Sequence, residues 1–256
     1  MQTILISGAS SGIGQALAMH YAKSAKTLIL LGRNPLRMEQ THKACQRAGL
    51  EIISHLGDVN DQISMHTFLQ TLLQTHSIDI AFLNAGQSAK QARQYEDCHS
   101  AQSQDHALIN SHLHGMINML HPIMEKMQQQ KSGHIVFMSS LNAFIPLSQS
   151  PIYGAVKAAV LHYGLALYPR LKKQGINVSI ICPGFVKSRL TKLNLFKMPG
   201  LLEAPCAAKI IDKGLKKKKL IIGFPWRNYT ATRCFALLPK SWQIALLNKM
   251  FGHISY

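Results

Sequence analysis

The sequence predicts a doubly wound α/β fold, in which a mostly parallel seven-stranded sheet carries helices on both faces. Short apolar runs alternate along the chain with helical stretches of about 10–20 residues, which is the pattern of βαβ units. The apolar runs are nearly continuous, as expected for strands buried on both faces. With 256 residues, 47% hydrophobic and 15% charged, the chain is long and apolar enough for one domain with a large core.

Seven strands are expected at the apolar runs. They cover 3–7, 27–32, 51–56, 78–86, 133–140, 177–184 and 219–224. Helices are expected from the turn after the first strand to about 23, at 35–48 and 61–74, within 98–130, and at 153–173. Two further short helices, broken at Pro239, are expected near the C-terminus, because proline interrupts a helix.

The domain organisation follows from these elements. Residues 1–225 are expected to form one domain, and 226–256 a helical C-terminal extension packed on that domain, on a partner subunit or on a membrane surface. The connection at about 188–203 is rich in Leu, Phe and Met. We expect it to form a mobile substrate lid over an apolar substrate. Ordinary helix packing is the alternative interpretation.

Ligands of doubly wound folds bind beyond the carboxyl ends of the strands, where the strand order reverses. The stretch SGASSGIG, at 7–14, follows the first strand and opens a helix. Its glycines at 8, 12 and 14 let the backbone turn tightly and approach a pyrophosphate at the helix N-terminus. The sequence therefore predicts a dinucleotide site here, with a glycine-rich turn that binds nothing as the alternative.

The residues after the second and third strands indicate which dinucleotide is bound. Arg33 follows the second strand, and no acidic residue occurs between 27 and 38. An acid in this region suits the ribose hydroxyl of NAD, whereas arginine suits the 2′-phosphate of NADP. We therefore expect NADP(H) rather than NAD(H), unless Arg33 only faces water. Asp58 follows the third strand and suits the adenine, although it and Asp61 are also candidate helix N-caps, with Asp61 favoured.

A tyrosine and a lysine form the most suggestive pair in the chain. Tyr153 and Lys157 are four residues apart in a run of helix formers, so they share one helix face. Ser140 ends the fifth strand, 13 residues before Tyr153; Ser139 is the alternative hydroxyl. Alone, the pair could be a surface tyrosine beside a solvated lysine.

Taken together in order, these motifs resemble those of the short-chain dehydrogenase/reductase family. The resemblance rests on SGASSGIG, NAG at 84–86, Ser140, Tyr153-Gly-Ala-Val-Lys157 and PGFVKS at 183–188, and it covers about 1–190. It points to the branch of short Rossmann-fold oxidoreductases. Leu83 stands where the family often has asparagine, and Ser188 where it often has threonine.

The resemblance implies roles for four residues. Tyr153 would be the general acid/base, Lys157 would lower the pKa of its phenol, and Ser140 would bind the substrate carbonyl oxygen. Asn110 would bend its helix and hold a water in a proton relay. The cofactor would be held by residues at the strand ends, namely Gly8, Ser10, Ser11, Gly12, Ile13, Gly14, Arg33, Asp58, Val59, Asn84, Ala85, Gly86, Tyr153, Lys157, Pro183, Gly184 and Val186.

The predicted function is that of an NADP(H)-dependent oxidoreductase that interconverts a carbonyl and an alcohol, with an apolar substrate and a homodimeric or homotetrameric assembly. A cofactor-binding regulatory or scaffold protein without turnover is the alternative. No metal is expected, because the closely spaced His112 and His114 lack a third ligand at suitable spacing. These histidines are expected on the long helix, at or near a subunit interface.

The net charge of +17 admits nucleic acid, an anionic membrane or an anionic cofactor as a partner. No nucleic-acid-binding motif accompanies it, so we expect no nucleic acid. The lysine run 216–219 and the C-terminal helices could form a peripheral membrane patch; packing within the protein is the alternative. Five cysteines without a CxxC pair, and an N-terminus unlike a secretory signal, predict a cytoplasmic protein, with peripheral membrane contact left open.

Overall fold

The computed structural model describes residues 2–87, 98–148, 151–188, 191 and 198–251. Its seven strands are all parallel and form one sheet in the order β3-β2-β1-β4-β5-β6-β7. They are β1 (Thr3–Ser7), β2 (Thr27–Gly32), β3 (Glu51–Leu56), β4 (Ile80–Leu83), β5 (Gly133–Met138), β6 (Ile176–Pro183) and β7 (Ile221–Phe224). The prediction of a doubly wound α/β fold is thus confirmed.

The fourth strand is shorter than predicted, since it ends at Leu83 instead of reaching Gly86. The reason is a change of hydrogen-bond partner. The backbone N–H groups of Asn84 and Ala85 both donate to the side-chain hydroxyl of Ser7, at 2.9 and 3.0 Å, instead of continuing the ladder. The chain therefore leaves the sheet at this point.

Most helices occur where the sequence predicts them, but the helix at Ala204–Lys216 was not among the expected helices. They are α1 (Gly12–Tyr21), α2 (Pro35–Cys45), α3 (Gln62–Thr75), α4 (Cys98–Ile109), α5 (Gly115–Gln130), α6 (Pro151–Lys173), α7 (Ala204–Lys216), α8 (Trp226–Phe235) and α9 (Lys240–Phe251). Asp61 caps α3 by accepting a hydrogen bond from the Ser64 N–H, as expected. The long helix predicted within 98–130 is interrupted, because a π-helical turn, Asn110–His114, separates α4 from α5.

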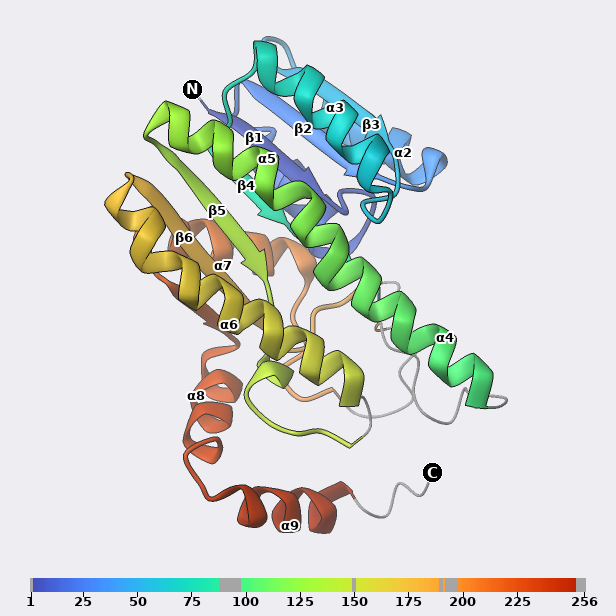
Figure 1. The fold of residues 1–256 in the computed structure, drawn as a ribbon, viewed down its shortest axis with the longest axis vertical. Coiled ribbons are helices and arrows are strands. Elements are labelled where there is room, and N and C mark those ends of the chain that lie inside the picture. The colour runs from blue at the N-terminus through green and yellow to red at the C-terminus, as the bar shows by residue number, and fades with distance from the viewer. Residues whose placement is uncertain (1, 88–97, 149–150, 189–190, 192–197, 252–256) are drawn as a thin grey trace.

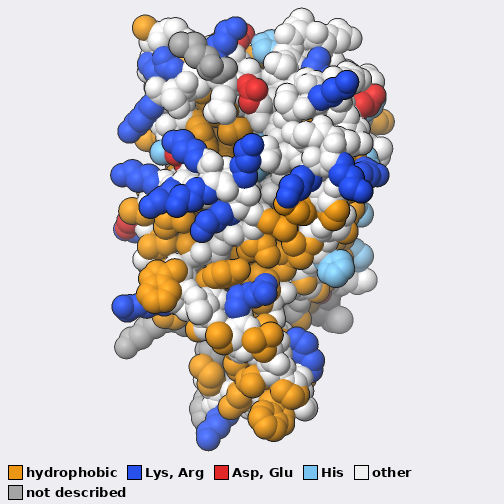
Figure 2. All heavy atoms as spheres, turned by 90° about the vertical axis from the view of Figure 1, so that its left-hand side faces the viewer, with side chains coloured by type: hydrophobic (Ala, Val, Ile, Leu, Met, Phe, Trp, Pro, Cys, Tyr) orange, Lys and Arg blue, Asp and Glu red, His pale blue; other side chains and the backbone are white. Residues whose placement is uncertain are grey.

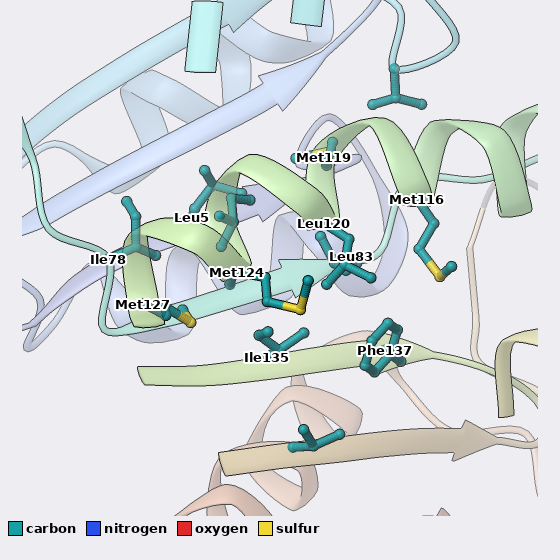
Figure 3. Packing of buried hydrophobic residues seen from close by; sticks show 14 of the residues in the cluster. Leu5, Ile78, Leu83, Met116, Met119, Leu120, Met124, Met127, Ile135 and Phe137 are labelled. Atoms are coloured by element: carbon teal, nitrogen blue, oxygen red, sulfur yellow. The ribbon is translucent and has the colours of Figure 1, made fainter. Parts of the chain in front are cut away.

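The helices form two layers, one on each face of the sheet (Figure 1). Residues of α3, α5 and α6 pack on one face, and residues of α1, α2 and α7 pack on the other. Figure 3 shows the first layer, where methionines of α5 lie against Leu83, Ile135 and Phe137 of the neighbouring strands. The inner strands are buried on both faces, which explains their continuous apolar sequences. The edge strands β3 and β7 are only partly buried.

The strand order reverses at β1, which lies between β2 and β4. A connection on one side of this point crosses to one face of the sheet, and the next crosses to the other face. The carboxyl ends of β1 and β4 therefore border a crevice, which is the ligand position in open α/β sheets. The glycine loop follows β1 and Asn84–Gly86 follow β4, whereas most other predicted site residues lie at or after the ends of β2, β3, β5 and β6.

The last two helices, α8 and α9, lie below the sheet in Figure 1. α8 follows β7 directly, and the ring of Tyr229 packs so closely on Gly223 that a side chain at that position would overlap it. Pro239 lies in the turn between α8 and α9, as predicted. Within the part of the chain that the structure describes, no helix is both long and apolar enough to cross a membrane.

Candidate active site

The glycine-rich loop has the geometry of a phosphate cradle. Gly8 adopts a φ of 68°, a conformation that side chains disfavour. A Cβ on Gly14 would lie 2.2 Å from the Gly8 carbonyl oxygen, so only glycine lets α1 approach β1 this closely. Ser11, at the start of α1, makes no side-chain capping hydrogen bond, whereas Asn34 and Asp61 cap α2 and α3. The first N–H groups of α1 are therefore available to an anion, which fits the pyrophosphate of a dinucleotide.

Asn84 connects this loop to β4. Its side-chain amide donates to the Ser7 carbonyl at 2.8 Å and to the Gly8 carbonyl at 3.4 Å. The structure therefore places Asn84, Ala85 and Gly86 beside the glycine loop. The hydrogen bonds of the Asn84 amide fix the shape of the loop, while contact with an adenosine stays a prediction.

Arg33 and Asp58 form an ion pair at the ends of β2 and β3. Arg33 Nη1 lies 2.9 Å from Asp58 Oδ2, and Asp58 Oδ1 accepts from the Asn60 N–H at 3.0 Å. The Arg33 side chain is 54% exposed, and an ion pair at that exposure stabilises a fold by at most about 1 kcal/mol. The guanidinium thus lies beyond the ends of β2 and β3, and exchanging its partner would cost little stability.

Ser140 and Tyr153 are brought together by β5 and α6. The Ser140 hydroxyl lies close enough to the Tyr153 phenol to lower its pKa. Ser140 Oγ also accepts from the Asn142 N–H at 3.2 Å and donates to the Pro183 carbonyl at 3.5 Å. Ser139 is used differently, because its hydroxyl donates to the Lys157 carbonyl at 2.8 Å and is buried. Of the two serines that the sequence offered, Ser140 is the one that faces the tyrosine.

Lys157 is almost fully buried, with a relative exposure of 3%. Its Nζ donates to the Met138 carbonyl at 2.7 Å and lies 3.0 Å from Nδ1 of His112. Neither partner carries a negative charge at neutral pH. Burial therefore dominates and lowers the pKa of Lys157 to about 7.

The pKa of Tyr153 shifts in the direction opposite to the expectation. Burial raises it, and the hydrogen bond with Ser140 lowers it by less. Lys157 Nζ lies 5.6 Å from the centre of the tyrosine ring. An amine that burial itself makes easy to deprotonate cannot outweigh the desolvation of the phenol.

Asn110 does not join this cluster. It is the first residue of the π-helical turn, and its side chain is exposed. His112, two positions on, points to a different side and contacts Lys157. We expected His112 at or near a subunit interface and missed its contact with Lys157, whereas the structure buries it. The spacing of Leu108, His112 and Met119, which continues the apolar face of this helix, could have indicated this burial.

Pro183 ends β6, and Gly184 and Val186 follow it. The Gly184 N–H donates to the Phe224 carbonyl at 2.7 Å, and Val186 pairs with Leu202 in an isolated bridge. Part of the predicted lid at 188–203 lies outside the described residues, since only 188, 191 and 198–203 are described.

The segment after Ser140 carries an aromatic cluster shared with α8. The rings of Phe144 and Tyr229 meet edge to face, with centroids 6.1 Å apart. The Arg233 guanidinium lies 5.1 Å from the centre of the Phe144 ring. The first C-terminal helix thus contributes side chains next to the chain segment that carries Ser140.

Comparisons with known proteins show the family to which the chain belongs. A family model described as short chain dehydrogenase matches residues 2–196. An uncharacterized oxidoreductase of Myxococcus xanthus is 29% identical over 240 residues, which are 93% of each chain.

Solved structures share the fold over nearly the whole chain. A short-chain dehydrogenase from Sphingobium yanoikuyae in complex with NADPH has a TM-score of 0.76 and 23% identity, and the match covers 99% of this chain and 95% of that one. A short chain dehydrogenase/reductase from Burkholderia phymatum in complex with NAD has a TM-score of 0.80 and 20% identity, with coverage of 91% and 92%. Because the family model matches most of the sequence, the chain belongs to the short-chain dehydrogenase/reductase family and is an oxidoreductase.

Proposed function

We propose that the protein is an NADP(H)-dependent oxidoreductase that interconverts a carbonyl and an alcohol. The observation that carries the proposal is the neighbouring hydroxyls of Ser140 and Tyr153 beside buried Lys157. Ser140 follows β5, near the strand ends that carry the glycine loop. Two neighbouring hydroxyl groups suit a carbonyl oxygen that gains negative charge during reduction.

The proposed roles follow from the contacts. When bound, the nicotinamide cofactor would supply or accept the hydride. Ser140 donates a hydrogen bond to the substrate oxygen, and Tyr153 gives that oxygen its proton. Protonated Lys157, held by the Met138 carbonyl, places positive charge near the phenol and stabilises the phenolate that remains.

Replacement of the proposed acid tests this assignment. Tyr153→Phe should lower kcat by about 10²- to 10⁴-fold while NADPH binding, followed by its fluorescence, is retained. Tyr163→Phe is the matched control, because Tyr163 lies on the same helix and its ring meets that of Phe137. Full turnover by Tyr153→Phe would refute the assignment. Wild-type protein that binds NADPH but turns over no ketone or aldehyde would favour the scaffold alternative.

The preference for NADP(H) is supported by Arg33 and by the absence of an acid near the end of β2. In the proposal, Arg33 exchanges its contact with Asp58 for the 2′-phosphate. Arg33→Met should therefore lower kcat/KM for NADPH by about tenfold or more, as expected for loss of a charged hydrogen bond, and change the value for NADH little. Arg227→Met is the control on an exposed arginine. Equal loss with both cofactors would contradict the preference.

An apolar substrate is supported by Phe144 and Tyr229, whose rings meet beside the segment that carries Ser140. A series of methyl ketones of increasing chain length tests it. Each CH₂ group that becomes buried contributes about 0.8 kcal/mol, or roughly a fourfold gain in kcat/KM. A flat series would contradict an apolar site.

We also propose that the C-terminal helices touch an anionic membrane surface from the cytoplasmic side. The large exposed apolar residues of this region are Trp226, Leu237, Trp242, Ile244, Leu246 and Met250. Figure 2 shows hydrophobic side chains gathered over the lower part of this face, with Lys and Arg side chains above them. Apolar residues beside basic ones are the chemistry of an interfacial helix on anionic lipid.

Vesicle flotation tests this surface. The protein should float with vesicles that contain phosphatidylserine and remain in solution with vesicles of phosphatidylcholine alone. Trp242→Gln, on α9, should weaken the flotation. Trp226→Gln, on α8, should do the same. Protein that binds neither vesicle would overturn the proposal.

We also propose that the protein forms a homodimer or a homotetramer. Light scattering would measure the assembly, and a monomer would contradict this proposal.

A further inference from the structure

His112 is the only described side chain that approaches the Lys157 amine with a nitrogen atom. It belongs to the π-helical turn between α4 and α5 and is buried, with a relative exposure of 6%. Its Nδ1 lies 3.0 Å from Lys157 Nζ, and its ring meets the Tyr153 ring edge to face, with centroids 5.7 Å apart. The histidine therefore contacts both residues of the proposed acid/base pair.

The second ring nitrogen decides which tautomer is present. His112 Nε2 lies 2.8 Å from the backbone carbonyl of Gln87. A carbonyl oxygen can only accept, so Nε2 carries the proton and Nδ1 is a bare acceptor. Burial and the neighbouring Lys157 lower the pKa of His112 to about 3, so the ring is neutral at physiological pH. A neutral acceptor can receive a hydrogen bond from a lysine ammonium without repelling it.

The His112 ring fits against Gly86 because a glycine has no side chain. A Cβ on Gly86 would lie 2.0 Å from Cε1 of His112. The π-helical turn widens the helix at the position where His112 reaches toward α6, and such turns are frequent at functional sites. Two independent features of the fold, the glycine and the turn, therefore accommodate the ring.

We propose that His112 is a positioning residue for Lys157. Its bare Nδ1 accepts a hydrogen bond from the amine, while the Gln87 carbonyl fixes the tautomer that makes this possible. The ring thus holds the amine beside Tyr153 and favours its protonated form. The consequence for catalysis rests on the proposed function, whereas the contact itself does not.

Two substitutions separate the acceptor from the rest of the ring. The Oδ1 of His112→Asn can accept from Lys157, whereas His112→Leu cannot, and both variants lack the hydrogen bond to Gln87. The protonation of Lys157 is followed in the protein without cofactor by NMR of lysines labelled at ¹³Cε. The Lys157 resonance is assigned by its loss in Lys157→Met. Tyr153 and Cys182 are the other titratable groups that face the amine, and burial raises the pKa of both.

We expect the Lys157 titration midpoint to fall by about one pH unit in His112→Leu, as loss of a hydrogen bond to a charged group implies. In His112→Asn it should stay close to the wild-type midpoint. Equal midpoints in the wild type and His112→Leu would overturn the proposal. If His112→Leu does not fold, ¹⁵N NMR of wild-type His112 decides the question. A ring that carries its proton on Nδ1, or that titrates between pH 5 and 8, would also overturn it.

The kinetic test distinguishes this inference from the proposed function. In reduction, the high-pH limb of kcat/KM should move to lower pH in His112→Leu and return in His112→Asn, because protonated Lys157 is the active form. A fold defect would lower the whole profile without moving the limb. If the wild type turns over no carbonyl compound, the proposed function fails, while the NMR titration still decides the role of His112.

Discussion

Buried Lys157 costs the fold stability, and the cost depends on pH. The structure lowers its pKa from the ordinary 10.5 to about 7, so the unfolded chain binds the proton more tightly than the folded chain does. Below about pH 7 the full cost is present. As the pH rises from 7 toward 10.5, the unfolded chain loses its advantage and stability increases.

The magnitude follows from the two pKa values. With 10.5 in the unfolded and about 7 in the folded protein, linkage gives a stabilisation of about 2 kcal/mol between pH 7 and pH 9. Lys157→Met removes this titration. It also leaves the Met138 carbonyl and His112 Nδ1 without their donor, which costs about 1–3 kcal/mol each but does not vary with pH in this range.

The comparison is therefore made between two pH values. Urea unfolding of the wild type and Lys157→Met, without cofactor and at one protein concentration, gives the free energy of unfolding at pH 7 and pH 9. The wild type should gain about 2 kcal/mol in free energy of unfolding between pH 7 and pH 9, and the variant should not gain it. Lys209→Met, at an exposed position of α7, should show no such change. A difference that is the same at both pH values would show that Lys157 titrates normally in the fold.

Three further outcomes are expected. Gly14→Ala forces a Cβ against the Gly8 carbonyl and should lower the free energy of unfolding by about 1–3 kcal/mol together with NADPH affinity; unchanged denaturation and titration curves would contradict the close packing. Tyr21→Phe removes the hydroxyl that donates to Asp212 at 3.1 Å and should cost about 1 kcal/mol in chemical denaturation, whereas a neutral result would show that the bond contributes nothing. Burial lowers the pKa of His134 to about 4, so the free energy of unfolding falls as the pH drops from 6.5. Between pH 7 and pH 5, His134→Gln should lose about 2 kcal/mol less of this free energy than the wild type does. Equal losses in the two proteins would refute this.

The positions of the strands along the chain could be predicted from the sequence because the pattern repeats locally. Each buried parallel strand is an apolar run, and α3 has its own start signal, Asp61. The glycines at 8 and 14 also allowed the tight turn and the close approach of α1 to be predicted, since both require glycine. These features depend on residues that are near each other in the sequence.

The end of β4 and the choice between Ser139 and Ser140 were decided by contacts across the fold. Ser7, 77 residues before Asn84, supplies the hydroxyl that ends β4. The Ser139 hydroxyl turns to the Lys157 carbonyl, which only the packing of α6 on β5 brings close. No local pattern contains this information.

By itself, the sequence determined the fold class, the glycine loop and the helix face that Tyr153 and Lys157 share, because short-range spacing and alternation define them. Only the tertiary structure decided which residue of the long helix meets Lys157. A π-helical turn brings His112 to the amine and leaves Asn110 exposed. The tertiary structure also set the direction of the pKa shifts, since burial, and not the neighbouring residue in the sequence, dominates the charge of Tyr153 and Lys157.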